Sequence, residues 1–391
     1  MPRKKLLYPR QSRRLSRAFS PNRRRFLQGT AAAMAGMALS NCRGNLENVQ
    51  SDGATDASAD GSAAGGDSDT LHIYTWANYT DDDMLARFTE KTGYNVIVDT
   101  FESNEVMLAR MTGGGGDVYS IIYPSDYVVQ EMVDLGLLSE LDLTQVTGLD
   151  NLLDNWKDPG YDPGNAHSIP FAWGTSGLLY NRTVLTDPPT DWDYLWDNQD
   201  DLARRITLLD DVRETLGAVL KSLGYSYNSN NPDEIEEAYE RLSELRPAIA
   251  SFMTSGYEDA LLGGDLSVVM AYSSDAAVVI EENADFEYIV PESGTSVWTD
   301  TIVIPSAAPN SAAAYEWINF ILEPGATAKA VERLYFATPN ANAIEMLPDE
   351  IKSNDDVFPP NEVIARCEGI APLEEETEEL FDRYWTQITG A

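Results

Sequence analysis

The sequence predicts an α/β protein built as two lobes that two extended segments join. Short β-branched runs alternate with amphipathic stretches in two separate regions, a pattern typical of parallel α/β sheets. Two long apolar extended runs, near residues 172–178 and 298–304, separate these regions from each other and from a helical C-terminal part. The length of 391 residues exceeds one average domain, which is consistent with two lobes.

The first 41 residues have the features of an export signal rather than of a folded segment. Arg23-Arg24-Arg25-Phe26-Leu27 resembles a twin-arginine motif, and the apolar run at 30–39 that follows is too short to span a bilayer. Leu39-Ser40-Asn41-Cys42 resembles a lipobox, a cleavage site whose cysteine becomes lipidated. We therefore expect residues 1–41 to be a signal and Cys42 to anchor the protein to the outer face of the cell membrane.

Residues 42–69 connect this signal to the rest of the chain. They are mostly Gly, Ala, Ser, Asp and Thr, with almost no large apolar residue. Such a segment cannot bury enough apolar surface to fold. We expect it to be a flexible acidic tether.

The chain is strongly acidic, with a formal charge of −37. Ten of its 27 basic residues and no acidic residue precede Cys42, so the remainder carries 17 basic against 64 acidic residues, or −47. This balance argues against nucleic acid and anionic membrane surfaces as partners. A halophilic surface explains most of the excess charge, and attraction of cationic ligands needs only a few of the acids.

Few residues are available for metal or nucleophilic chemistry. The chain has two cysteines and two histidines, which indicate neither a disulfide framework nor a zinc enzyme. No Gly-x-Ser-x-Gly motif occurs, and the histidines have no evident nucleophile beside them. A secreted enzyme that uses Asp211 and Glu214 as an acid–base pair remains the least favoured alternative.

The region after residue 69 begins with alternating strands and helices. Side chains typical of helix N-caps, at Thr80–Asp83 and at Ser103, mark the starts of the first two helices, and four glycines at 113–116 lack the Gly-Lys-Ser/Thr of a phosphate loop. The predicted strands are Thr70–Trp76, Asn95–Thr100 and Asp117–Tyr123, and the predicted helices end near Gly93, Met111 and Leu135. In such sheets ligands bind beyond the carboxyl ends of the strands, where Trp76–Tyr79 and Pro124–Tyr127 lie.

The second region repeats this organisation. Asp211 and Glu214 share one face at the start of a helix, where acids also commonly complement the helix dipole. The predicted extended runs are Ser168–Gly174, Gly177–Asn181, Arg205–Leu209, Leu266–Tyr272 and Phe286–Val290, and the predicted helices lie at 192–196, 210–223 and 233–246. Further helices are expected at about 311–322, 325–333 and 374–388.

The segment Gly294–Pro305 contains the clearest candidate site. It starts with turn formers and ends in the apolar strand Thr301–Ile304 before a proline. Trp298 and Asp300 are two residues apart, so on an extended chain they point to the same side. A carboxylate beside an indole ring suits an organic cation, although a core tryptophan beside a solvated aspartate has the same spacing.

Seven short segments in this order resemble the spermidine/putrescine-binding family of ABC-importer lipoproteins, over roughly residues 70–390. They are 73–79, 101–105, 123–127, 169–174, 210–214, 297–300 and 338–340. The resemblance implies a two-lobed periplasmic-binding-protein-like fold of type II, with a cleft between the lobes. It assigns residues 70–173 and 300–344 to lobe 1, and residues 174–299 and 345–391 to lobe 2.

The resemblance also implies which side chains contact the ligand. Asp211 and Glu214 match acids that bind one end of a polyamine, and Asp300 matches the acid at another amine. Trp298 matches the ring that stacks on the methylene chain. The full set of matching positions is Trp76, Tyr79, Ser125, Tyr127, Asp211, Glu214, Tyr272, Asp275, Trp298, Asp300 and Phe336.

Several of these positions depart from the family pattern. Asn78 stands where the spermidine binder has an acid, Tyr272 replaces a tryptophan, and Phe336 lacks the hydroxyl of a family tyrosine. One end of the pocket is therefore less anionic than in the family. Another organic cation or an amino-acid derivative stays open as a ligand.

The function implied by the resemblance is capture of a polyamine outside the cell and its delivery to a membrane permease. The lobes would close around the ligand by a hinge motion, and the permease would recognise the closed form. No cofactor or metal is implied, and we expect a monomer. Because molar salt screens exposed charges beyond about 3 Å, buried pairing must supply the selectivity.

Overall fold

The computed structural model describes residues 69–185 and 187–390. The predicted signal at residues 1–41, Cys42 and the predicted tether lie outside the described residues, apart from Asp69 at the end of the tether. Among the helices of the described ranges, none combines the length and the apolar character that a membrane span requires.

Ten strands of the described part of the chain form one mixed sheet. The hydrogen-bonded order is β2-β1-β3-β9-β4-β7-β5-β6, while β10 pairs with β9 and β8 pairs with β4. The strands are β1 Thr70–Trp76, β2 Asn95–Phe101, β3 Ile121–Ile122, β4 Ser168–Asn181, β5 Ile206–Leu208, β6 Ile249–Phe252, β7 Val268–Tyr272, β8 Phe286–Ile289, β9 Ser296–Val303 and β10 Glu368–Gly369. Parallel pairing within β2-β1-β3 and within β7-β5-β6 gives the two α/β regions that the sequence predicts.

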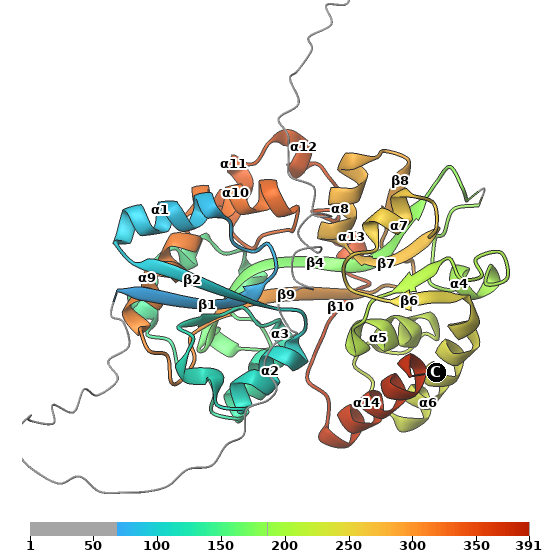
Figure 1. The fold of residues 1–391 in the computed structure, drawn as a ribbon, viewed down its shortest axis with the longest axis horizontal. Helices are drawn as coiled ribbons and strands as arrows, with labels where there is room; N and C mark the ends of the chain where they lie inside the picture. The colour runs from blue at the N-terminus through green and yellow to red at the C-terminus, as the bar shows by residue number, and fades with distance from the viewer. Residues whose placement is uncertain (1–68, 186, 391) are drawn as a thin grey trace, which may run out of the picture. The chain divides into compact units, whose positions relative to one another are not determined.

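Helices cover both faces of the first region. Figure 1 shows α1 and α10 on one side of β1 and β2, with α2 and α3 on the other. The helices here are α1 Asp82–Thr92, α2 Asn104–Thr112, α3 Asp126–Asp134, α9 Ser311–Ile321, α10 Pro324–Leu334, α11 Ala341–Met346 and α12 Asp349–Lys352. The predicted caps are confirmed, since Asp81 accepts from the Met84 N–H and Ser103 from the Val106 N–H.

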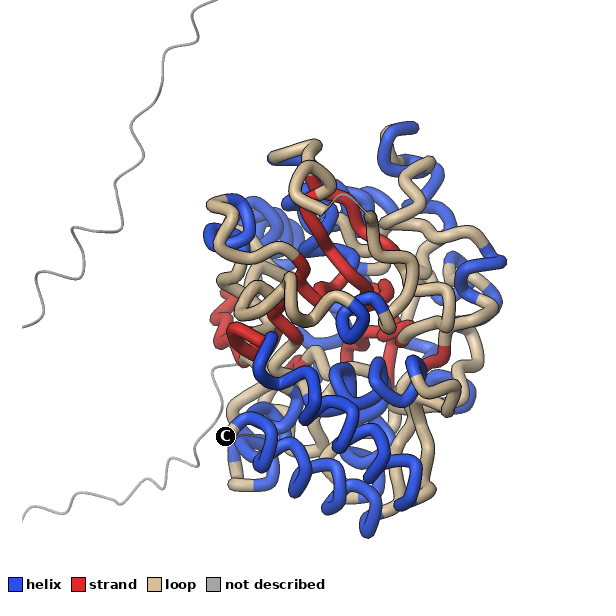
Figure 2. Tube along the Cα trace, turned by 90° about the vertical axis from the view of Figure 1, so that its right-hand side faces the viewer, coloured by secondary structure: helices blue, strands red, loops and turns tan. Residues whose placement is uncertain are grey.

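The second region has its own helical cover. Figure 1 shows α5 and α6 on the opposite side of the strands from α7 and α8, and α14 packs against α5 and α6. The helices here are α4 Tyr194–Asp197, α5 Val212–Ser222, α6 Pro232–Leu245, α7 Glu258–Leu262, α8 Ser273–Glu282, α13 Asn361–Ile364 and α14 Glu375–Thr389. Figure 2 shows the strands enclosed by helices and loops.

Strands β4 and β9 join the two regions, as the two predicted crossings require. Residues 168–175 of β4 pair with β9, and residues 176–181 pair with β7 and β8. The sequence predicts two runs interrupted at Gly174 and Gly177, but β4 is continuous. These glycines serve close packing instead, because a Cβ on Gly174 would lie 2.4 Å from the Trp298 ring and one on Gly177 would lie 2.2 Å from the Ile289 carbonyl.

Three other predicted elements differ from the structure. β3 is limited to Ile121–Ile122, because a 3₁₀ turn at Gly115–Asp117 occupies the start of the predicted strand. The short helix predicted at 192–196 begins two residues later, at Tyr194. Helix α8 follows β7 directly, where the sequence predicts only the end of a strand. The Val-Val-Ile run of α8 is β-branched and hides the helix, whereas its alanines and glutamates favour one.

The apolar core consists of separate clusters on either side of the β4–β9 crossing. One set combines Phe88 and Trp317 with residues as late as Val357. The other combines Leu216 and Leu242 with Phe381 of the last helix. The apolar side chains therefore form two compact groups. The residue bounds of the two lobes stay a prediction.

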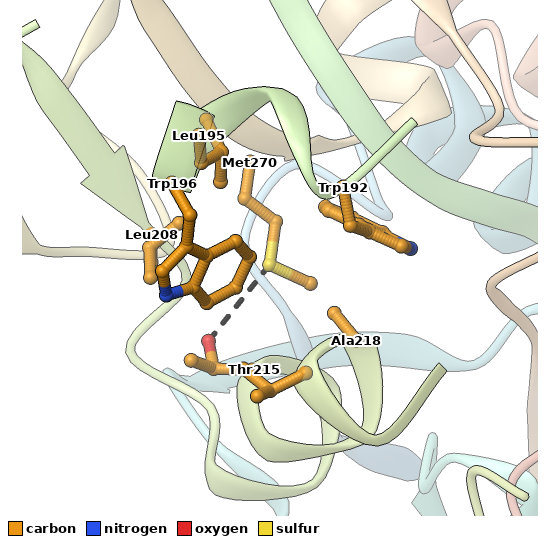
Figure 3. Close-up of a pocket in the computed structure, with 8 residues that line it drawn as sticks. Trp192, Leu195, Trp196, Leu208, Thr215, Ala218 and Met270 are labelled. Carbon is orange, nitrogen blue, oxygen red and sulfur yellow. Dashed lines mark hydrogen bonds between the residues drawn. The ribbon is translucent and has the colours of Figure 1, made fainter. Parts of the chain in front are cut away.

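Two hollows lie in these groups. The first, of about 10 Å³, is enclosed by Trp192, Trp196 and Met270 (Figure 3) and is too small for anything beyond one water molecule. The second, of about 220 Å³, lies beside the glycine loop 114–116, and Asp117 is among the residues that line it. Neither hollow is lined by a described residue of the predicted site, so that site has to be traced from its side-chain contacts.

Candidate ligand-binding site

Asp300 connects three segments of the first region. It is 6% exposed on β9, where its Oδ1 accepts from the Ser125 hydroxyl at 2.8 Å and its Oδ2 accepts from the Tyr79 hydroxyl. Ser125 is the N-cap residue of α3, and Asn104 of α2 donates to both the Ser125 and the Tyr127 hydroxyl oxygens, at 3.1 and 3.0 Å. Four predicted site residues therefore meet through a continuous hydrogen-bond network.

Asp211 and Glu214 meet at the start of α5. Asp211 is the N-cap residue and accepts from the Glu214 N–H at 2.9 Å. Glu214 is 2% exposed, and its Oε2 accepts three hydroxyl donors, from Ser176, Ser296 and Tyr227, at 2.8, 2.7 and 3.0 Å. Because all three bonds go to Oε2, they leave Oε1 available to a further donor.

Tyr272 and Trp298 link these two acidic groups. Their ring centroids are 5.8 Å apart at an interplanar angle of 77°, an edge-to-face contact. The Tyr272 hydroxyl lies 3.5 Å from an oxygen of Asp211, and Trp298 is two residues before Asp300 on β9. The aromatic side chains therefore lie between the α5 acids and the Asp300 carboxylate.

The remaining predicted residues have different surroundings. Asp275 of α8 is half-buried, and its charge acts on the Tyr79 hydroxyl, which is also the donor to Asp300. Phe336 is a core residue packed behind Tyr79, with ring centroids 5.8 Å apart. Trp76 lies at the edge of the group, where its ring packs against Phe101 at 4.5 Å.

The four acidic side chains of this group have no cationic partner in the described part of the chain. Of the ion pairs found there within 4.0 Å, none includes Asp211, Glu214, Asp275 or Asp300. Buried carboxylates without a partner are costly. No ion pair among the described residues therefore balances these four charges.

The pKa values of these carboxyl groups are raised, as expected for buried acids without an ion pair. Burial raises the pKa of Asp211 to about 7, with a further contribution from the Glu214 charge. Burial likewise raises the pKa of Asp275 to about 7, and that of Asp300 to about 6 despite the hydroxyl donors on Asp300. An added cation would favour the ionised form of each group.

The sequence analysis missed supporting residues of this site. Asp126, between two predicted residues, is 3% exposed, and burial raises its pKa well above the usual range, with a further contribution from Asp300. Ser176, Ser296 and Tyr227 surround Glu214, but nothing in their spacing relates them to it. Asn104 lies in a segment that supports the family resemblance, and only its contacts reveal its role.

Comparison with known proteins decides the family. A model of the family described as bacterial extracellular solute-binding protein matches residues 83–359. The chain belongs to this family. This solute-binding protein is 32% identical over 304 residues to a spermidine/putrescine-binding periplasmic protein of Salmonella typhimurium, across 77% of this chain and 86% of that protein.

Solved structures agree with this membership. A spermidine/putrescine ABC transporter substrate-binding protein from Streptococcus pneumoniae superimposes with a TM-score of 0.73 at 34% identity, over 83% of this chain and 99% of that one. A lipoprotein of Treponema pallidum gives a TM-score of 0.74 at 25% identity, over 83% and 100%. The family resemblance and the fold class predicted for this solute-binding protein are confirmed.

Proposed function

We propose that this solute-binding protein captures a polyamine outside the cell and delivers it to the permease of an ABC importer. The observation that carries the proposal is the group of four carboxylates that form no ion pair with another described residue, of which Asp211, Glu214 and Asp300 act on the Tyr272 hydroxyl and Asp275 acts on the Tyr79 hydroxyl. A polyamine provides several ammonium groups for the acids and methylene groups for the rings. The relatives named above are spermidine/putrescine-binding proteins, which supports the same ligand class here.

Each part of the group has a distinct role in this proposal. Asp211 and the Oε1 oxygen of Glu214 bind one ammonium group, and Asp300 with Asp275 binds another. Trp298 and Tyr272 cover the hydrocarbon between them, while Tyr79, Ser125, Tyr127, Trp76 and Phe336 shape the surrounding wall. Asn78 stands where the spermidine binder has an acid, so the end of the site near Tyr79 is less anionic. This difference favours a short diamine over a longer polyamine.

The ligand would be bound between two lobes that close around it. We propose lobe 1 as residues 70–173 with 300–344, and lobe 2 as residues 174–299 with 345–391. The separate core clusters on either side of the β4–β9 crossing support two bodies that can rotate relative to each other. The apolar contacts of Leu347 and Val357 with the first cluster favour a later end for lobe 1.

Export and anchoring belong to the same proposal. The twin-arginine motif at 23–27 would direct the folded chain across the membrane, and a lipidated Cys42 would hold the monomer at the outer face. The similar Treponema pallidum protein is described as a lipoprotein, which supports this anchor. Exchange of Cys42 for alanine should move the protein from the membrane fraction to the medium, and continued membrane attachment would contradict the anchor.

A ligand screen tests the function. Calorimetry and thermal shift of the whole protein in high salt, with putrescine, spermidine, spermine, agmatine and betaine, should give saturable binding of at least one polyamine. Binding of betaine alone would favour another organic cation as the ligand, and no binding by any of the five would refute the proposal. Recovery of the ligand unchanged after incubation separates a binding protein from an enzyme, since a polyamine-processing enzyme would convert it.

A further inference from the structure

Arg213 is a buried cation between two carboxylates of the proposed site, yet it pairs with neither. It is the second residue of α5, two positions after Asp211 and one before Glu214, and is only 5% exposed. Among the described residues, no carboxylate oxygen lies within 4.0 Å of its guanidinium nitrogens. An arginine beside unbalanced acids would ordinarily form an ion pair with one of them.

The guanidinium group of Arg213 is hydrogen-bonded to Asn228 and Ala371 instead of to these acids. Its Nη2 donates to the Asn228 Oδ1 at 3.2 Å and to the Ala371 carbonyl at 2.9 Å. Asn228 is itself fixed, because it accepts from the Ala371 N–H at 2.8 Å and donates to the Gly369 carbonyl at 2.9 Å. The position of the guanidinium group is therefore set by the segment that leads into α14.

Two aromatic rings also contact the guanidinium group of Arg213. The Arg213 Cζ lies 5.7 Å from the ring centroid of Tyr127 on α3 and 5.7 Å from that of Phe381 on α14. Both distances are within the range of cation–π attraction. Tyr127 belongs to the Asp300 network of the first region, so Arg213 contacts both sides of the proposed site.

We propose that Arg213 is a positioning residue that supplies positive charge to the ligand site while leaving the carboxylate oxygens of Asp211 and Glu214 free for an ammonium group. This inference rests on the proposed polyamine-binding function. A rigid guanidinium group is suited to the role because its fixed planar fork can be held by a few acceptors, whereas a lysine ammonium group would move to the nearest carboxylate.

The surrounding charges determine how this role depends on pH. Arg213 faces Asp211 and Glu214 at the start of its own helix, Tyr127 on α3, Tyr227 after α5 and Glu378 on α14, and Glu105 of α2 also acts on Asp211. Burial raises the pKa of Asp211 and of Glu214, and the Arg213 charge works against that rise. At acidic pH Arg213 therefore helps these acids to stay ionised for the ligand.

The same charge also repels the ammonium groups of the ligand. The pKa of about 7 for Asp211 already includes the effect of the Arg213 charge, so loss of that charge raises this pKa further. At about pH 8.5 the acids still lose less of their ionisation than at about pH 6, and removal of the repulsion offsets part of that loss. Loss of the charge should consequently weaken binding more in acid than in base. A residue with a merely structural role would give the same loss at both pH values.

Two substitutions in the full chain test the proposal. Calorimetry with putrescine or spermidine, at about pH 6 and about pH 8.5, compares wild type with Arg213→Gln and Arg213→Lys. Arg213→Gln should bind roughly tenfold more weakly at the lower pH and show a clearly smaller loss at the higher pH. Arg213→Lys should bind more weakly at both, because its flexible ammonium group pairs with Asp211 or Glu214.

Arg241→Gln is the matched control. Arg241 also lies over an aromatic ring, 4.4 Å from the centroid of Trp196, but it pairs with Asp193 away from the predicted site residues. It should bind like wild type at both pH values. Wild-type affinity of Arg213→Lys at both pH values would overturn the proposal, as would an equal loss for Arg213→Gln at both if that variant folds. Failure of the wild type to bind any polyamine would instead refute the proposed function.

Discussion

Replacement of Asp300 by asparagine should make the ligand-free protein more stable while weakening ligand binding. Asp300 is 6% exposed and accepts hydroxyl donors from Ser125 and Tyr79. Asparagine has nearly the same shape but no charge, and the two hydroxyl groups can rotate to bond to an amide. The substitution therefore isolates the effect of one buried negative charge.

The effect on stability follows from the pKa shift. Burial raises the pKa of Asp300 from 3.8 to about 6, so the folded chain holds this proton more tightly than the unfolded chain. The resulting stabilisation is present below about pH 4 and is lost as the pH rises through about 6. At pH 8 the ionised group costs roughly 3 kcal/mol of folding free energy.

Asparagine removes this cost, which is already net of the two charge-assisted hydrogen bonds because they lower the pKa of Asp300 from a still higher value. The free energy of unfolding at pH 8 should therefore rise by up to about 3 kcal/mol, seen as an increase in Tm. Binding should show the opposite effect, because loss of one partner from a buried charge pair costs about 3 kcal/mol, roughly a hundredfold in Kd.

Thermal melts without ligand and calorimetry with putrescine and spermidine measure both effects on the same sample. Asp265→Asn, an exposed acid in the loop before β7, is the control and should change neither quantity. Unchanged affinity in Asp300→Asn would refute the role of this carboxylate. A large loss of stability would contradict the claim that its charge is uncompensated in the free protein.

Three further predictions concern pH, packing and stability. The affinity for the polyamine should be highest above about pH 7 and should fall as the pH drops through about 6, because the ligand must then displace protons from Asp275 and Asp300. Calorimetry in two buffers of different ionisation enthalpy should show that binding releases protons near pH 6.5. Absence of this proton release would contradict the shifted pKa values. Gly174→Ala should weaken binding at least tenfold, since the new Cβ lies 2.4 Å from the Trp298 ring and displaces it, and a Kd equal to that of wild type would show that this ring does not contact the ligand. Trp192→Phe should lower the free energy of unfolding, measured by urea unfolding, by about 2 kcal/mol. The variant loses the buried 2.9 Å hydrogen bond from the indole N–H to the Gly294 carbonyl and some packing beside the small cavity. Its Kd for the ligand should not change.

The sequence predicts the alternating elements well because local signals determine them. Asp81, Ser103 and Asp211 cap the helices that their residue types indicate, and the apolar β-branched runs form strands. The sequence fails where tertiary contacts decide. Gly174 reads as a break in a strand, yet it is needed because a tryptophan from another strand packs directly against it. Such a contact joins residues more than a hundred positions apart and leaves no local signal.

The candidate site shows the same division. Trp298 and Asp300 could be selected from their spacing on one strand, and Asp211 with Glu214 from their position in one helical turn. Asp126, in the 123–127 segment, and Arg213, between Asp211 and Glu214, have no such local signal, because their importance comes from burial and from forming no ion pair with another described residue. Charge balance in a folded site depends on all of its segments together, so only the coordinates reveal it.

A crystal structure of the protein with bound spermidine or putrescine would show whether the four acids and the Trp298 ring hold the ligand. We expect ammonium nitrogens within about 3 Å of the Asp300 carboxylate and of Asp211 or Glu214, with the methylene chain against the Trp298 ring. Ligand density on another surface, with Asp211, Glu214, Asp275 and Asp300 all without contact to it, would contradict the proposed site.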